Sequence, residues 1–305
     1  MFEKIAFFGS SDFAIPILEA LLKSSKVELI VTQIPRPAGR NKRLTPTPVS
    51  SFARKNNLNL VEIQNVNDEN FINYLKEMKI DVGIVIAFGQ ILKPKLLEAI
   101  PQGFFNVHAS LLPKYRGAAP IQRTLFDGAN ESGITIFKID KGLDTGKIAM
   151  AERIEVDPLD TFDTLSKKLA LLGAKMISDF VKLQKVELRD QEGTPSYAPK
   201  ITTDETIINW NLPALKIGNL IRALDSKPGA RTTLNGEMVK LFGFSGIMDV
   251  NGRPGEIIKI NSKGMIGCGD HSIILSHIQF QSKKVMSFSE AKNGRKIDTG
   301  SIFGT

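Results

Sequence analysis

Three side chains in the middle of the sequence could together carry out proton transfer. Asn106 and His108 lie two residues apart in FFNVHASLLPKYRG, and Asp144 stands in the glycine-bounded stretch KGLDTG. Histidine has an ordinary pKa near neutrality, which suits general acid–base catalysis. An aspartate could orient the imidazole, and an asparagine amide could donate to a developing oxyanion. A lone histidine at a strand end is usually structural, but this combination indicates an active site.

Other catalytic chemistries have weaker support in the sequence. Ser110 is close to His108 but lacks the G-x-S-x-G setting of an activated serine, and Cys268 belongs to a separate C-terminal segment. His108 and Asp144 are too few to bind a metal, so we expect none. Direct attack by a bound amine on a donated one-carbon group therefore fits these residues best.

The elements that must position these residues have the pattern of a parallel α/β sheet. Four apolar runs predict buried strands: Ile5–Phe8, Val27–Thr32, Asp81–Ala87 and Phe104–His108. A helix capped by Asp12 should follow the first run. Side chains two apart on a strand point the same way, so Asn106 and His108 can face one pocket. The glycine turn after the first run lacks the GxGxxG spacing, so nothing there indicates a dinucleotide.

A proline-rich basic segment interrupts this pattern at residues 34–48, IPRPAGRNKRLTPTP. Its four prolines exclude a regular helix or a central strand. Four basic residues crowd onto it: Arg36, Arg40, Lys42 and Arg43. Two interpretations remain open from the residues alone, a solvated surface loop or an unstructured arm that contacts a polyanion.

The second half of the chain predicts a different kind of domain. Residues 187–206 are polar and contain two prolines, which is typical of an interdomain linker. Residues 208–226 contain a helix-like stretch with Leu215, Leu220 and Leu224. Short alternating runs from Ala230 onward indicate a small β barrel or sandwich. We therefore expect a Rossmann-like α/β catalytic domain at 1–186, a linker at 187–206 and an all-β domain at 207–305.

The amino-acid composition indicates the charge of a binding partner. The net charge is +8, and residues 206–305, with 13 basic and 7 acidic residues, supply +6 of it. An anionic partner is therefore favoured. The single cysteine excludes an intramolecular disulfide. No apolar run reaches the ~18 residues of a membrane span. We expect a cytoplasmic protein without membrane contact, and a monomer because no oligomeric partner is indicated.

Several motifs give the sequence a family resemblance. FNVHASLLPKYRGAAPIQ followed by GITIFKIDKGLDTG resembles the signature of the formyltransferases that use 10-formyltetrahydrofolate. FFGSSDFA, IPRPAGRNKRLTPTPV, VIAFGQIL and IINWN extend the resemblance over the whole chain to the members that act on methionyl-tRNA. Three departures occur, at Ser10-Ser11, at Ile34-Pro35 and at residues 227–231, and none touches the three candidate catalytic residues.

This resemblance implies roles for individual residues. Asn106, His108 and Asp144 would be catalytic, with 10-formyltetrahydrofolate as co-substrate, no metal, and initiator methionyl-tRNA as acceptor. The folate pocket would be lined by Ala87, Phe88, Gly89, Ser110, Leu111, Leu112 and Pro113. The insertion that reaches the tRNA would contain Arg36, Arg40, Lys42 and Arg43. The C-terminal domain would be an OB-like, tRNA-binding barrel.

The catalytic stretch alone leaves alternatives open. A formyltransferase acting on a small amine, such as an amino sugar or glycinamide ribonucleotide, would share it, as would a formyltetrahydrofolate hydrolase. The basic segment at residues 34–48 and the basic C-terminal region favour tRNA, because a small substrate needs neither. A non-enzymatic RNA-binding module would leave the three candidate catalytic residues unexplained.

Overall fold

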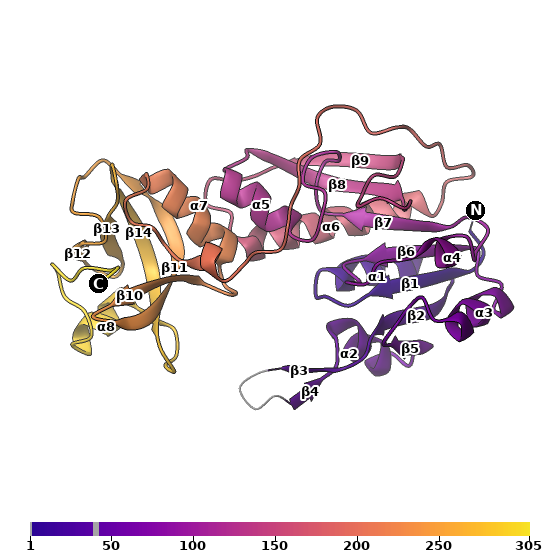
Figure 1. The fold of residues 1–305 in the computed structure, drawn as a ribbon, viewed down its shortest axis with the longest axis horizontal. Coiled ribbons are helices and arrows are strands. Elements are labelled where there is room, and N and C mark those ends of the chain that lie inside the picture. The colour runs from indigo at the N-terminus through magenta and orange to yellow at the C-terminus, as the bar shows by residue number, and fades with distance from the viewer. Residues whose placement is uncertain (1, 39–42) are drawn as a thin grey trace. The chain divides into compact units, whose positions relative to one another are not determined.

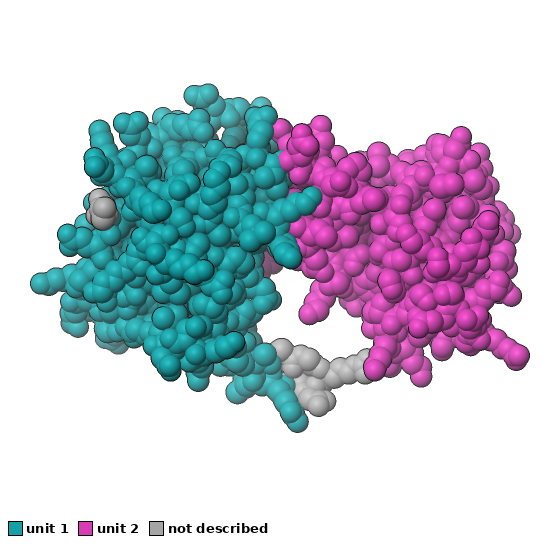
Figure 2. Space-filling model, turned by 180° about the vertical axis from the view of Figure 1, so that it is seen from behind, with its two compact units in different colours: residues 1–117, 132–154, 166–197 teal, residues 118–131, 155–165, 198–305 magenta. Residues whose placement is uncertain are grey.

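The computed structural model describes residues 2–38 and 43–305, and Figure 1 draws their helices and strands, most of them labelled. The chain divides into two compact units, coloured separately in Figure 2. Unit 1 consists of Met1–Gly117, Ser132–Ile154 and Ser166–Tyr197, and unit 2 of Ala118–Glu131, Glu155–Leu165 and Ala198–Thr305. Both units therefore contain several separate stretches of the chain.

Unit 1 is built on a seven-stranded sheet with the order β5-β2-β1-β6-β7-β8-β9. Its strands are β1 (Ile5–Gly9), β2 (Val27–Gln33), β5 (Leu60–Ile63), β6 (Val82–Ile86), β7 (Phe104–His108), β8 (Glu131–Lys138) and β9 (Ile148–Glu155). Neighbours from β5 to β7 pair in parallel, whereas β7 and β8 are antiparallel. The predicted mostly parallel, Rossmann-like sheet is confirmed.

The central strands of this sheet are apolar along their whole length because they are covered on both faces. Every residue of β1 and of β6 is buried, which is typical of parallel strands between layers of helices. Phe8 on β1 packs edge-on against Phe104 of β7 and against Phe88, with ring centroids 5.4 and 5.7 Å away. Phe88 follows β6 at the carboxyl edge of the sheet, whereas Phe104 begins β7, so these aromatic contacts extend from that edge into the core.

Unit 1 contains the helices α1 (Ala14–Ser24), α2 (Pro48–Lys55), α3 (Glu69–Glu77) and α4 (Pro94–Leu97), and all of α6 (Phe162–Phe180) except its first turn, which belongs to unit 2. Thr47 and Asp68 cap α2 and α3 through their side-chain oxygens. The predicted Asp12 cap of α1 is wrong. Phe13 already has helical dihedrals, and the backbone carbonyls of Ser11 and Asp12 accept from the first amides instead. None of the described helices has the length and apolar character needed to cross a membrane.

Most of the described residues of the proline-rich basic segment form regular structure, so the unstructured arm, one of the two interpretations left open by the sequence, does not describe them. β3 (Arg36–Ala38) and β4 (Arg43–Thr45) form an antiparallel hairpin that extends away from the main sheet (Figure 1). Pro37 pairs with Leu44 within it. The prolines exclude only a central strand, because each strand of a two-stranded ribbon has an unpaired side that needs no N–H donor.

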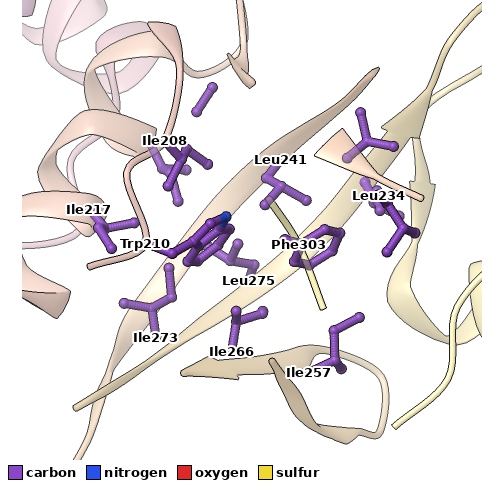
Figure 3. Close-up of a cluster of buried hydrophobic side chains, with 14 of the residues drawn as sticks. Ile208, Trp210, Ile217, Leu234, Leu241, Ile257, Ile266, Ile273, Leu275 and Phe303 are labelled. Atoms are coloured by element: carbon purple, nitrogen blue, oxygen red, sulfur yellow. The ribbon is translucent and has the colours of Figure 1, made fainter. Parts of the chain in front are cut away.

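Unit 2 contains an antiparallel sheet with the order β10-β11-β14-β13-β12, with β15 paired to β14. Its strands are β10 (Ala230–Leu234), β11 (Glu237–Met248), β12 (Ile257–Ile260), β13 (Gly264–Gly267), β14 (Ser272–Phe280) and β15 (Met286–Ser287). The predicted all-β character of the C-terminal region is confirmed. Buried side chains from this sheet and from the helices of unit 2 form one apolar core (Figure 3). In it Trp210 stacks on Phe303 at a centroid distance of 5.7 Å.

Three helices and a 3-10 turn accompany this sheet: α5 (Pro120–Asp127), α7 (Ala214–Leu224), α8 (Phe288–Asn293) and η1 (Asp204–Thr206). α5 packs against α7 within unit 2. α7 buries Ile217, Ile221 and Leu224, whereas Leu215 is exposed. The predicted helix is present, and of the three leucines named from the sequence Leu224 is buried, Leu220 half-buried and Leu215 exposed.

Candidate active site

β7 carries Asn106 and His108 on one face of the strand, between β6 and β8. Asn106 pairs with Val85 of β6 and with Phe137 of β8. Continuing the parallel register by two residues brings Ala87, just beyond β6, level with His108. Asn106 is half-buried, and His108 is 5% exposed. The strand thus delivers both side chains toward the carboxyl edge of the parallel sheet, where ligands bind in open α/β folds.

Both nitrogens of the His108 ring face protein oxygens. Nε2 lies 2.9 Å from the carbonyl oxygen of Tyr115. A carbonyl oxygen can only accept, so Nε2 carries the proton of this bond. Nδ1 lies 3.7 Å from Oδ2 of Asp144, close enough for charge interaction but beyond a normal hydrogen bond. The Tyr115 carbonyl therefore fixes the ring directly, and Asp144 supplies a nearby negative charge.

The loop that carries Asp144 is held by its own backbone and by a neighbouring loop. Asp144 has φ 53°. A Cβ on Gly146 would lie 1.7 Å from the Lys138 carbonyl oxygen, so only glycine fits there. The Asp140 carboxylate accepts from the Gly142 amide at 3.0 Å and from the Thr145 hydroxyl at 2.6 Å. These contacts make a tight turn that presents Asp144 to its neighbours.

The Asp144 carboxylate makes its shortest contact with the loop that follows β7. Its Oδ2 accepts a 2.7 Å hydrogen bond from the backbone amide of Gly117. Tyr115, two residues earlier, supplies the carbonyl bound by His108. The same loop therefore holds both the imidazole and the carboxylate, and the structure brings His108 and Asp144 together as the sequence predicted.

The predicted folate-lining residues 110–113 mostly support this loop. The Ser110 hydroxyl donates to the Lys114 carbonyl at 2.6 Å, and the Thr135 hydroxyl donates to the Ser110 carbonyl at 2.7 Å. Leu112 is buried with Phe137 and Ile148. Pro113 is buried and Leu111 half-buried. Ser110 and Leu112 thus hold the loop in place, and Leu111 is the most exposed of these four residues.

Of the predicted folate-lining residues after β6, one is buried and two are exposed. Phe88 is 2% exposed, and its carbonyl accepts from the side chains of Ser10 and Gln33. Ala87 and Gly89 are exposed and have φ of 45° and 79°. Positive φ values turn successive peptide groups outward in a way that regular strands do not. Ala87 and Gly89 therefore present backbone at this edge, while Phe88 belongs to the core.

Part of the predicted tRNA-binding set can be located. Arg36 and Arg43 are exposed on the β3–β4 hairpin. Arg40 and Lys42 lie outside the described residues. In the described part of the chain, no group of three or more His, Cys, Asp or Glu side chains is arranged to hold a metal ion.

Sequence reasoning missed three groups at this site. The Tyr115 carbonyl and the Gly117 amide are backbone groups, which every non-proline residue has, so the residue types do not predict their role. Gln191, in the segment predicted to be a linker, donates to the carbonyls of Asp144 and Gly146. Its only signal in the sequence was the polar composition of that segment, which does not specify a partner.

Comparison with known proteins agrees with this arrangement. Residues 3–181 match a family described as formyl transferase, and residues 200–296 one described as formyl transferase, C-terminal domain. A methionyl-tRNA formyltransferase of Kosmotoga olearia is 44% identical over 310 residues and covers 99% of both chains. One of Thermotoga maritima is 42% identical over 306 residues and covers 98% of both.

A solved structure also has this fold. The N-formyltransferase of Helicobacter canadensis, in complex with folinic acid and dTDP-3-aminofucose, superposes with a TM-score of 0.67 at 21% identity, covering 90% of this chain and 99% of its own. At that identity the likeness concerns the fold alone. The family matches span both halves of the chain and include the residues around His108 and Asp144. The chain belongs to the formyl transferase family.

Proposed function

We propose that the protein transfers the formyl group of 10-formyltetrahydrofolate to the amino group of methionyl-tRNA, with the initiator tRNA as its substrate. The observation that carries this proposal is the identity of 44% and 42% to methionyl-tRNA formyltransferases over 99% and 98% of the chain. That similarity includes the C-terminal region as well as the formyl transferase domain. An acceptor recognised by the whole chain is therefore favoured over a small amine.

The available side chains support direct attack by the amine. The Ser110 hydroxyl is occupied by the Lys114 carbonyl. Burial raises the pKa of the Cys268 thiol to about 12, and a protonated thiol is a poor nucleophile. Neither residue is suited to form a covalent formyl intermediate. In this proposal the methionyl nitrogen bonds to the formyl carbon, and the bond from that carbon to the folate nitrogen then breaks.

Asn106, His108 and Asp144 would carry out this transfer. The Asn106 amide and the His108 imidazole would donate to the formyl oxygen, on which negative charge develops as the amine adds. Asp144, 3.7 Å from the imidazole, would stabilise the protonated ring and help move the amine proton toward the leaving nitrogen. His108 would turn from the Tyr115 carbonyl toward the reacting oxygen in this step.

The folate donor would bind beside these residues at the carboxyl edge of β6 and β7. Ala87 and Gly89 offer exposed backbone there. Backbone N–H and C=O groups can pair with the ring nitrogens and the amide-like edge of a pterin. The 110–113 loop, packed on Thr135 and Phe137, would form the opposite wall.

The tRNA would bind through basic residues of both regions. The β3–β4 hairpin presents Arg36 and Arg43, and residues 206–305 supply +6 of the net charge of +8. Lys and Arg contacts to phosphates give salt-dependent binding. In this proposal residues 1–186 form the catalytic domain and residues 207–305 an OB-like tRNA-binding domain, in a cytoplasmic monomer.

A formylation assay tests the proposal. The protein is incubated with 10-formyltetrahydrofolate and methionylated initiator tRNA, and formylmethionyl-tRNA is quantified after mild hydrolysis of the ester. We expect rapid formylation of the initiator and much slower formylation of methionylated elongator tRNA as control. Formylation of neither tRNA would contradict the proposed function.

A further inference from the structure

The chain segment after α6 docks onto the loops of the candidate active site. Arg189 exchanges two backbone hydrogen bonds with Ile148 at the start of β9, of 2.8 and 2.9 Å. Further along, the Ser196 hydroxyl accepts from the Tyr115 amide at 2.9 Å, and the Ser196 carbonyl accepts from the Arg116 amide at 2.9 Å. All these residues belong to unit 1. The segment between residues 189 and 196 is therefore held at both ends.

Gln191 lies in the middle of this docked segment and uses every hydrogen-bonding position of its amide. Nε2 donates to the carbonyl of Asp144 and to the carbonyl of Gly146, both at 2.8 Å. Oε1 accepts from Nη2 and Nε of Arg116, at 2.7 and 3.2 Å. The opposite amide orientation would face an NH₂ toward a guanidinium and an oxygen toward two carbonyls. Only the observed orientation satisfies all four contacts.

These bonds give Asp144 two anchors. Gln191 holds its backbone carbonyl, and the Gly117 amide holds its carboxylate. Arg116, which orients Gln191, is the residue immediately before Gly117. The 115–117 loop therefore supplies one anchor directly and orients the other, and both act on the same aspartate, whose Oδ2 lies 3.7 Å from Nδ1 of His108.

We infer that Gln191 is a positioning residue for formyl transfer: it fixes the Asp144 loop so that the carboxylate faces His108. This inference rests on the proposed function, in which Asp144 acts on the imidazole. Small displacements of a catalytic group lower the rate without removing substrate binding. Gln191 thus acts through Asp144 and has no contact of its own with the reacting atoms.

The variant Gln191→Glu tests this inference with little change in shape. A carboxylate keeps the acceptor for Arg116, but it replaces the NH₂ group with an oxygen that faces the carbonyls of Asp144 and Gly146. We expect kcat to fall roughly 10- to 100-fold, with KM for both substrates within about twofold. The matched control is Gln184→Glu, the same change at an exposed residue of the preceding chain, and it should keep the wild-type kcat.

A double-mutant cycle with Asp144→Asn separates positioning from general destabilisation. If Gln191 acts through Asp144, the variant with both changes is no slower than Asp144→Asn alone. Losses that multiply, or a Gln191→Glu enzyme as fast as wild type, would overturn the inference. If Gln191→Glu does not fold, Gln191→Met, which is uncharged and of similar length, takes its place in the cycle.

The same assay distinguishes the two levels of the proposal. A wild-type enzyme that makes no formylmethionyl-tRNA overturns the proposed function together with the part that Gln191 has in it. An Asp144→Asn variant that forms this product as fast as wild type leaves the function in place and overturns the roles of both Asp144 and Gln191. A slow Asp144→Asn variant beside a fast Gln191→Glu variant overturns the positioning inference alone.

Discussion

The polar contacts around His108 in unit 1 and those around Arg222 in unit 2 differ in what their charged side chains face. His108 is bound by the Tyr115 carbonyl, and its partner Asp144 stands 3.7 Å away on a separate loop. Arg222, on α7, donates to the Asp160 carbonyl at 2.8 Å and to the Asn219 side chain at 2.7 Å. The first cluster is built from loops at a sheet edge, and the second is inside a packed unit.

Arg222 shows how a buried charge is arranged when it has a structural purpose. It is 4% exposed, and burial lowers the pKa of its guanidinium while the nearby Asp160 and Asp157 oppose that shift. Its hydrogen-bond acceptors are close and fixed. Such a group stabilises the arrangement of its neighbours and leaves no place for a substrate.

In the His108 cluster, by contrast, the charged partners do not bind each other directly. Its titratable pair is not in direct hydrogen-bond contact, and each member is held by backbone from the 115–117 loop. In the proposed reaction a substrate oxygen replaces the Tyr115 carbonyl as the hydrogen-bond partner of the imidazole. The contrast predicts that substitutions at His108 or Asp144 change turnover, whereas substitution of Arg222 changes stability.

The largest expected effect tests the catalytic side of this contrast. Asp144→Asn keeps an acceptor for the Gly117 amide but removes the negative charge beside His108. We expect kcat to fall ~10²–10⁴-fold with little change in the thermal midpoint. Steady-state formylation and a thermal melt measure the two quantities. Asp190→Asn, the same change at an exposed aspartate, is the control and should leave both unchanged.

An unaltered kcat in Asp144→Asn would remove the distinction between the two clusters. A large loss of thermal stability in the same variant would also do so, because it would make the carboxylate a structural group like Arg222.

The next largest effect concerns stability. Arg222→Ala leaves the Asp160 carbonyl and the Asn219 side chain without their donor in a buried site, and we expect a loss of about 3 kcal/mol in the free energy of unfolding. The kcat of the folded enzyme at 25 °C should stay within about twofold of wild type. Urea unfolding and steady-state kinetics check both. The control, Lys216→Ala, changes an exposed residue of the same helix and should cost less than about 0.5 kcal/mol.

A slow but stable Arg222→Ala enzyme would show that the unit 2 cluster also takes part in turnover. That outcome would contradict the assignment of Arg222 to structure alone.

The smallest effect concerns a half-exposed ion pair in unit 2. Hydrogen bonds from Arg123 lower the pKa of Glu205 from 4.5 to about 2. Because the folded-state pKa is depressed, its stabilisation is complete above pH 4.5 and is lost as the pH falls from 4.5 toward 2. The side chain is 38% exposed, so we expect less than about 1 kcal/mol.

Glu205→Gln should therefore flatten the fall in stability between pH 4.5 and 2, with little effect on kcat. Unfolding by denaturant at several pH values measures the free energy of unfolding. Glu187→Gln, at an exposed residue of unit 1, is the control. If Glu205→Gln and wild type lost stability equally between pH 4.5 and 2, the ion pair with Arg123 would not contribute to stability.

Local patterns predicted the elements whose residues face an apolar core. β7 has the predicted bounds, and β1, β2 and β6 differ from prediction by a residue or so at their ends, because a continuous apolar run is sufficient to indicate a buried parallel strand. α5 was missed because it is short and weakly apolar. Its signals were Pro120 at the first turn and Gly128 in the left-handed C-cap, at φ 67°.

The parts of the fold and site that sequence could not predict depend on long-range polar contacts. Pro37 is compatible with the β3–β4 hairpin only because that ribbon is outside the main sheet. Gln191 binds residues 45 to 75 positions away in the sequence, and polar composition contains no information on such partners. His108 and Asp144 were predicted as a pair, but the carbonyl and amide that hold them come from the backbone of residues 115 and 117.

The central claim is that His108 takes part in the chemical step of formyl transfer. The most direct test is the single-turnover rate with enzyme in excess over methionylated initiator tRNA and saturating 10-formyltetrahydrofolate, for wild type and His108→Ala. The account predicts that His108→Ala forms the same product ~10²–10⁴-fold more slowly, with its thermal midpoint unchanged. Equal single-turnover rates for the two proteins would contradict it.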